Sequence, residues 1–168
     1  PEEAILPVID TTWVVSGNAE TRKNLITSIA LDFDELEKHN FKLQKKYEEI
    51  KKNETAYEGY RLEDAEVVLV SYGISSRIAR SAVDQAREKG MKVGLFRPLT
   101  LFPFPEKAFA DLSRRTKRFL TVELNTGQMV EDVKLSTERD VQVYFYGRPP
   151  GSLPSPDEVL EEIKKYYS

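Results

Sequence analysis

The stretch VVLVSYGISSRIARSAVDQAREKGMKVGLFRPLTLFPFPEKAF, residues 67–109, decides the fold class of this chain. Its first segment, Val67 to Ser71, is an apolar run containing three valines, which is typical of a strand buried on both faces of a sheet. Gly73 breaks the run, and Ser75 or Ser76 can cap a helix whose apolar residues recur at helical spacing. The stretch therefore begins as a strand followed by a helix.

The second half of the same stretch returns to a strand. Lys89 and Gly90 give the helix a favourable terminal charge and a stop, and Met91 to Phe96 is the next apolar run. The segment Arg97 to Pro105 holds three prolines and predicts a rigid loop, after which Pro105 can begin another helix. Repeated strand–helix–strand units indicate a parallel sheet with right-handed crossovers and helices on both faces.

The alternation continues to the end of the chain. Strands are expected at Phe119 to Leu124 and Val141 to Tyr146, with a short helix after the turn at Asn125 to Gly127 and a final helix from Ser155. A short edge strand is expected near Ala56 to Leu62. The sequence thus predicts an α/β fold of three layers, α/β/α, around a mostly parallel sheet of about five strands.

An N-terminal arm, residues 1–55, is expected to precede this compact domain, residues 56–168. Pro1 to Thr12 reads as connecting chain and does not begin with Met, which favours a fragment of a longer protein. Asp32 can cap a long helix that runs to about Asn53. Apolar residues follow heptad-like spacing along this segment: Phe33, Leu36, Leu43, Tyr47, Ile50 and Tyr57. So narrow a stripe suits a helix lying on one neighbour, either its own domain or a partner.

Composition excludes several function classes. The formal charge of −3 gives no attraction to nucleic acid or anionic lipid, and no apolar run reaches the ~20 residues of a membrane helix. No signal peptide pattern opens the chain, and a cytoplasmic setting is expected. The absence of cysteine excludes iron–sulfur ligation, zinc–thiolate sites and disulfides within the chain.

Ligands of such folds usually lie beyond the carboxyl ends of the strands. There, Gly73 is a lone glycine, so neither a dinucleotide fingerprint nor a phosphate loop is present. The helix start near Arg77 is either a small anion site or a plain capped terminus. Glu123 is either a base or, as we favour, an anchor that accepts backbone hydrogen bonds. His39, the only histidine, reads as a solvated helix residue. A basic cluster without aromatic neighbours is likewise interpreted as a solvated helix end: Arg114, Arg115, Lys117 and Arg118.

We therefore predict no catalytic, cofactor-binding or metal-binding residue in this chain. The candidates for contact with another protein lie in the loops after the strands: Tyr72, Gly73, Arg97, Pro98, Phe102, Glu123, Asn125, Gly127, Gln128 and Met129. The turn from Glu123 to Met129 allows two interpretations. It is either a recognition loop, with Gln128 and Met129 facing a partner, or a helix-capping turn that serves its own backbone.

The run at residues 67–109 resembles the C-terminal domain of the transketolase superfamily. The continuation RFLTVELNTGQMVEDVKL, residues 118–135, matches its next strand and turn. Within it, ELNTGQM is similar to the turn of 2-oxoacid:ferredoxin oxidoreductase α subunits. The arm sequence DFDELEKHNFKLQKKYEEI, residues 32–50, also resembles the segment that leads into the domain in that family.

The resemblance implies an enzyme that decarboxylates a 2-oxoacid on thiamine diphosphate and magnesium, passes electrons through an iron–sulfur cluster to ferredoxin, and transfers the acyl group to coenzyme A. In the family these groups lie in other domains or subunits. It therefore implies an assembly role, inactive in isolation, with a β subunit and a ferredoxin-type subunit as partners. The 2-oxoacid stays open between branched-chain acids and 2-oxoglutarate. Two alternatives also stay open: the equivalent domain of another thiamine enzyme, and a free-standing module that binds a small ligand or anion.

Overall fold

The computed structural model describes residues 9–27, 29, 31–138 and 140–167. The chain divides into two compact units, one up to Lys46 and one from Tyr47, and each is described by itself. Most of the connecting chain expected at Pro1 to Thr12 lies outside the described residues.

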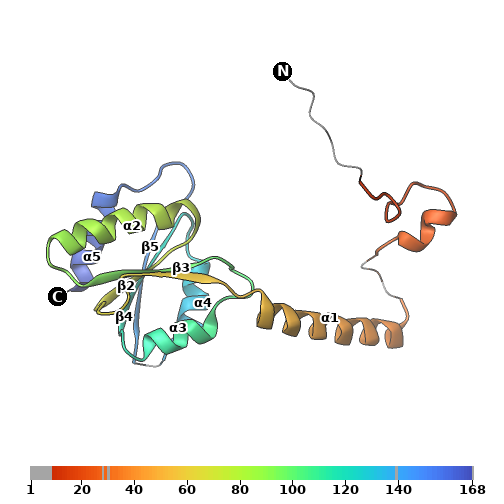
Figure 1. The fold of residues 1–168 in the computed structure, drawn as a ribbon, viewed down its shortest axis with the longest axis horizontal. Helices are drawn as coiled ribbons and strands as arrows, with labels where there is room; N and C mark the ends of the chain where they lie inside the picture. Colours follow the sequence, from red (N-terminus) through yellow and green to blue (C-terminus); the bar gives the residue numbers. More distant parts are fainter. Residues whose placement is uncertain (1–8, 28, 30, 139, 168) are drawn as a thin grey trace, which may run out of the picture. The chain divides into compact units, whose positions relative to one another are not determined.

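The second unit is built on a five-stranded sheet (Figure 1). Its strands are β1 (Tyr57–Tyr60), β2 (Val67–Val70), β3 (Val93–Pro98), β4 (Arg118–Glu123) and β5 (Gln142–Gly147). Their order is β1-β3-β2-β4-β5, so β1 and β5 are the two edges. β2 pairs in parallel with β3 and β4, β4 pairs in parallel with β5, and β1 runs antiparallel to β3. The predicted edge strand and the mostly parallel sheet are confirmed.

Helices cover both faces of the sheet, which confirms the three layers (Figure 1). They are α2 (Gly73–Glu88), α3 (Glu106–Ser113), α4 (Met129–Leu135) and α5 (Pro156–Tyr167). α2 and α5 pack on one face, and α3 and α4 pack on the other.

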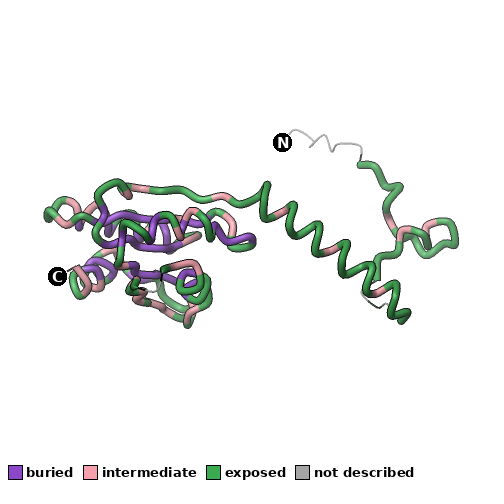
Figure 2. The backbone as a smooth tube through the Cα atoms, turned by 90° about the horizontal axis from the view of Figure 1, so that it is seen from below, coloured by how far each residue is buried: buried purple, intermediate pink, exposed green. Residues whose placement is uncertain are grey.

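Strand β2 explains why one apolar run supports two cores. Successive strand side chains point to opposite faces, so Val67 and Leu69 join the core under α2 and α5, while Val68 and Val70 join the core under α3 and α4. All four side chains are fully buried. Figure 2 shows the buried residues gathered in the sheet and on the inner sides of these helices.

The predicted starts of two elements were wrong by two or three residues. α2 begins at Gly73, with a φ of +58°, and not at Ser75 or Ser76. The hydroxyls of these serines donate to the carbonyls of Tyr72 and Gly73, so they support the first turn from inside the helix. β3 begins at Val93 and not at Met91, since the Met91 N–H still closes the end of α2 by donating to the Ala86 carbonyl.

The first unit contains a 3₁₀ helix, η1 (Glu20–Asn24), and the start of α1 (Phe33–Asn53). Asp32 caps α1 as predicted, because its Oδ1 accepts the Glu35 N–H at 2.9 Å. Leu36, Leu43 and Ile50, spaced by seven, are half-buried, whereas no described residue of α1 is fully buried. The predicted stripe is therefore confirmed at these three positions, whereas Phe33 and Tyr47, also predicted to belong to it, are exposed. α1 also crosses the division at Lys46, whereas the sequence suggested a boundary after residue 55.

Candidate functional site

The loops after the parallel strands meet at one side of the sheet, which we call the carboxyl edge. Tyr72 is the N-cap of α2, and Gly73 is its first residue. Arg97 and Pro98 end β3, and Phe102 follows in the next loop. The turn after β4 adds the remaining candidates, so the topology places all the candidate residues in the loops and strand ends of this edge.

Glu123 is the anchor of the turn between β4 and α4. Its side chain is only 1% exposed. Its Oε2 accepts the backbone N–H of Met129 at 2.9 Å and of Gln128 at 3.4 Å, and its Oε1 accepts the N–H of Val130 at 3.0 Å. The Asn125 amide donates to it at 3.1 Å. One carboxylate thus satisfies the free N–H groups at the start of α4, where the helix dipole also favours negative charge.

The rest of this turn also serves its own backbone. The Asn125 Oδ1 accepts the Gly127 N–H at 2.7 Å, and Gly127 has a φ of +108°, which a residue with a Cβ rarely adopts. Met129 is 3% exposed and packs in the core, so the interpretation of this residue as a partner contact was wrong. The helical spacing of Met129, Val130 and Val133 was the signal for a core position. Of the two residues proposed for recognition, only Gln128 is exposed.

Apolar side chains reach solvent at the carboxyl edge. Phe102 is 62% exposed, and its ring meets the Tyr47 ring edge-on with centroids 5.9 Å apart. Ile74, Leu99 and Leu101 are also exposed. We call these four residues with Gln128 the carboxyl-edge surface: Ile74, Leu99, Leu101, Phe102 and Gln128. Ile74, Leu99 and Leu101 were not among the contact residues predicted from the sequence. They could have been recognised as apolar residues that occupy no inward-facing position in a predicted helix or strand.

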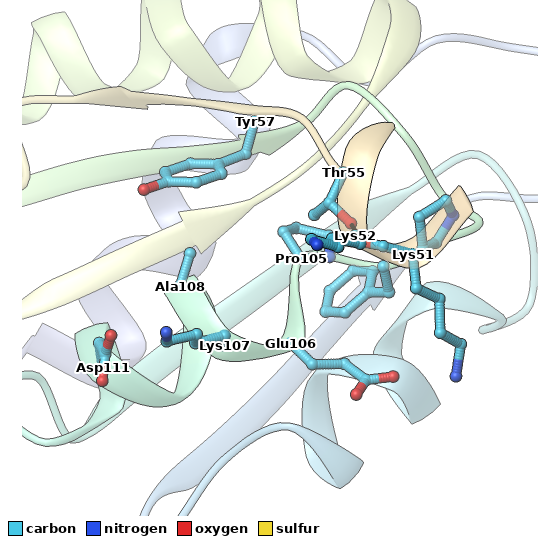
Figure 3. A pocket seen from close by; sticks show the side chains of 11 residues that line it. Lys51, Lys52, Thr55, Tyr57, Pro105, Glu106, Lys107, Ala108 and Asp111 are labelled. Atoms are coloured by element: carbon cyan, nitrogen blue, oxygen red, sulfur yellow. Dashed lines mark hydrogen bonds between the residues drawn. The ribbon is translucent and has the colours of Figure 1, made fainter. Parts of the chain in front are cut away.

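A pocket of about 590 Å³ lies beside this region, between the end of α1 and the start of α3 (Figure 3). Its aromatic part includes Tyr57, stacked on Phe96 with centroids 4.9 Å apart, and the largely buried Phe104. Lys51 and Lys107 lie on opposite sides of the view in Figure 3. Since Glu106 and Asp111 also line it, the pocket has mixed charge and no grouping of nucleophile and base.

The other charged residues considered as candidates are either exposed to solvent or contact other residues of the same fold. His39 is exposed on α1. In the basic cluster, Arg114 pairs with Asp111, and Arg118 donates to carbonyls of the last turn of α5. Desolvation, and then the charges of Glu106 and Glu123, raise the pKa of Asp132.

No metal site appears in the part of the chain that the structure describes: it contains no cluster of three or more His, Cys, Asp or Glu side chains suited to a metal ion. Nor does any helix within residues 9–27, 29, 31–138 and 140–167 have the length and apolar character needed to cross a membrane.

Comparison with known proteins agrees with this geometry. A family model described as pyruvate:ferredoxin oxidoreductase core domain II matches residues 65–159. Ketoisovalerate oxidoreductase subunit VorB of Methanothermobacter thermautotrophicus is 52% identical over 166 residues, which cover 98% of this chain and 47% of that protein. 2-Oxoglutarate synthase subunit KorA of Methanocaldococcus jannaschii is 34% identical over 122 residues, covering 73% of this chain and 31% of that protein.

Solved structures share the fold. The 2-oxoglutarate:ferredoxin oxidoreductase from Magnetococcus marinus matches with a TM-score of 0.71 at 19% identity, over 83% of this chain and 24% of that chain. A split-gene transketolase, an inactive β4 tetramer, matches with a TM-score of 0.56 at 19% identity, over 64% of this chain and 40% of that chain.

The fold is thus the α/β fold shared by domains of these oxidoreductases and of transketolase. Within that class, the chain belongs to the 2-oxoacid:ferredoxin oxidoreductase subunit family, as the resemblance predicted. It spans about half the length of the VorB subunits that it matches.

Proposed function

We propose that this chain is the C-terminal assembly domain of the α subunit of a 2-oxoacid:ferredoxin oxidoreductase, and that it has no activity in isolation. The observation that carries the proposal is the carboxyl-edge surface. It exposes Phe102 and three aliphatic side chains at the edge where folds of this kind place their functional contacts. Its occupant is another domain or subunit of the same enzyme, the β subunit being the first candidate.

The cofactors implied for the complete enzyme do not fit the residues of this chain. An iron–sulfur cluster needs thiolate ligands, and the sequence has no cysteine. Thiamine diphosphate with magnesium needs a diphosphate cradle and carboxylate or amide ligands. The one carboxylate in the turns of the carboxyl edge, Glu123, is buried and already occupied by backbone N–H groups. We therefore assign these cofactors, and coenzyme A, to other parts of the enzyme.

We further propose a branched-chain 2-oxoacid as the substrate of the complete enzyme. The support is the 52% identity to a ketoisovalerate oxidoreductase subunit, against 34% to a 2-oxoglutarate synthase subunit over a shorter stretch. Ferredoxin as acceptor, a ferredoxin-type subunit as a further partner, and a cytoplasmic location are parts of the same proposal. None of these needs a residue of this chain to take part in the chemistry.

The test is assembly of the full-length α subunit carrying Phe102→Glu with its β subunit. Removing an exposed aromatic anchor and placing a charge at an interface should weaken assembly at least about tenfold, measured as affinity between the purified subunits. The matched control is Leu135→Glu, a similar change at a residue that is 86% exposed on the last turn of α4 and outside the carboxyl-edge surface.

Both variants should unfold close to the wild-type temperature, because both side chains are mainly exposed. Normal assembly of the Phe102→Glu subunit would contradict the proposal. So would an equal loss in the Leu135→Glu subunit, since the effect would then reflect added charge and not the position of Phe102.

A further inference from the structure

We propose that a pocket at the β1 side of the sheet binds a small anion of the phosphate type with more than one negative charge. The pocket has a volume of about 430 Å³. It is formed by residues of β1, β3 and the first two turns of α2: Glu58, Gly59, Tyr60, Ser76, Arg77, Arg80, Leu95 and Arg97. We call it the arginine pocket. It shares no residue with the carboxyl-edge surface, and the proposal goes beyond the assembly function.

The charge of the arginine pocket is not balanced from within. Three arginines line it, and Glu58 is the one acidic residue of its lining. Glu58 lies directly opposite Arg97 across the β1–β3 pair, and its Oε2 accepts from the Arg97 Nη1 at 3.0 Å. Within the described residues, neither Arg77 nor Arg80 pairs with a carboxylate. Two positive charges are therefore left without an acidic partner in one concave site.

Two of the arginines are held in place by the fold. The Arg80 guanidinium lies over the Tyr60 ring, 4.2 Å from its centroid, and the Tyr60 hydroxyl donates to Asp84 at 2.7 Å. The ring is thus fixed by a hydrogen bond at one end and stacked by a cation at its face. Arg97 extends from the end of β3 and is held by Glu58. A site whose donors are already ordered loses less entropy when a ligand binds.

Arg97 also has an unused donor. Its Nε is buried and has no hydrogen-bond partner within the described part of the chain. Buried polar groups in folded proteins are nearly always paired, so this donor lacks an acceptor inside the fold. The Arg97 side chain as a whole is 38% exposed, so its accessible guanidinium N–H groups can face a bound anion. A guanidinium offers donors in a fork that matches phosphate and carboxylate oxygens.

A small anion fits the arginine pocket better than an acidic protein segment. The volume falls within the range of about 300–1,000 Å³ that is usual for small-molecule sites. The three arginines come from two elements and surround one cavity, whereas an acidic segment would need charges spread along a groove. Ser76 closes the first turn of α2 and Arg77 follows it, so the dipole of that helix adds to the attraction.

Inorganic pyrophosphate is the probe, titrated into the full 168-residue chain at low ionic strength. Calorimetry should give saturable binding at one site, and the Arg97 Nε–Hε resonance should shift with the same curve. The variant Arg77→Gln with Arg80→Gln should weaken binding at least about tenfold, because it removes two charge-assisted contacts. The control, Arg114→Gln with Arg115→Gln, removes the same charge outside the pocket and should change affinity by less than about twofold.

Thermal unfolding checks that the variant Arg77→Gln with Arg80→Gln is folded. Because both arginines are exposed, this variant should unfold at a temperature close to that of the wild type. Three outcomes would overturn the proposal: pyrophosphate binding that never saturates, an equal loss of affinity in the control, or a stationary Arg97 Nε–Hε resonance. Tighter binding of a glutamate-rich peptide than of pyrophosphate would also overturn it, because the pocket would then be a contact for an acidic protein segment.

Discussion

Glu123 shows how one buried charge can organise a turn. In the variant Glu123→Gln, one of the two carboxylate oxygens becomes an amide group that cannot accept, so at least one backbone N–H at the start of α4 loses its partner. We expect the free energy of unfolding to fall by roughly 1–3 kcal/mol in urea denaturation. The control is Glu131→Gln, because among the described residues its exposed carboxylate pairs with Lys134 alone. Equal stability of wild type and Glu123→Gln would show that the anchor contributes nothing.

Thr121 presents the opposite case. It lies in the buried strand β4, is fully buried, and its hydroxyl has no hydrogen-bond partner within the described residues. Thr121→Val keeps the shape and removes the unsatisfied group, so the free energy of unfolding should rise by about 1 kcal/mol. Ser71→Ala is the comparison, because the Ser71 hydroxyl donates to the Val122 carbonyl at 2.8 Å, and its loss should lower stability. If Thr121→Val unfolds at a lower urea concentration than the wild type, the Thr121 hydroxyl has a hydrogen-bond partner in solution.

Among the helices and strands, α1 and β2 should differ most in how well their backbone amides are protected from hydrogen exchange. α1 has no fully buried residue among those described, whereas every residue of β2 is buried. Amide hydrogens should therefore exchange faster in Leu36–Ile50 than in Val67–Ser71, measured by hydrogen–deuterium exchange with NMR or mass spectrometry. Similar rates in the two segments would show that α1 packs fully against the rest of the chain in solution.

The elements also show how far the sequence could lead. The apolar run of β2, the helical spacing of α2 and the proline loop after β3 predicted the sheet and its layers, because each pattern reflects burial on a fixed face. The start of β3 was missed since a residue that closes a helix and one that opens a strand can both be apolar, as Met91 is. Exposed apolar residues such as Phe102 carry no periodic signal, and the partners of the Arg97 side chain depend on the β1–β3 register, which the sequence does not display.

For the whole molecule, the expectation is a folded chain without oxidoreductase activity. The sequence has no cysteine to ligate a cluster, and the described residues form no cofactor cradle. The isolated chain should show no steady reduction of an electron acceptor when supplied with thiamine diphosphate, magnesium, coenzyme A and 2-oxoisovalerate. The matched experiment adds the remainder of the α subunit, the β subunit and the ferredoxin-type subunit, and activity should then appear. Turnover by the isolated chain would place catalytic groups in it and would contradict the proposed assembly role.

The position of β5 has a consequence for handling the isolated domain. It is an outer strand of the sheet, six residues long, with the sequence QVYFYG and no charged residue. One side of its backbone has no strand beside it in the described part of the chain. Natural proteins usually protect an exposed outer strand with lysine, proline or a β-bulge. An unprotected outer strand can pair with the same strand of a second molecule and start aggregation. Concentrated samples should therefore self-associate through β5 unless the rest of the enzyme shields it.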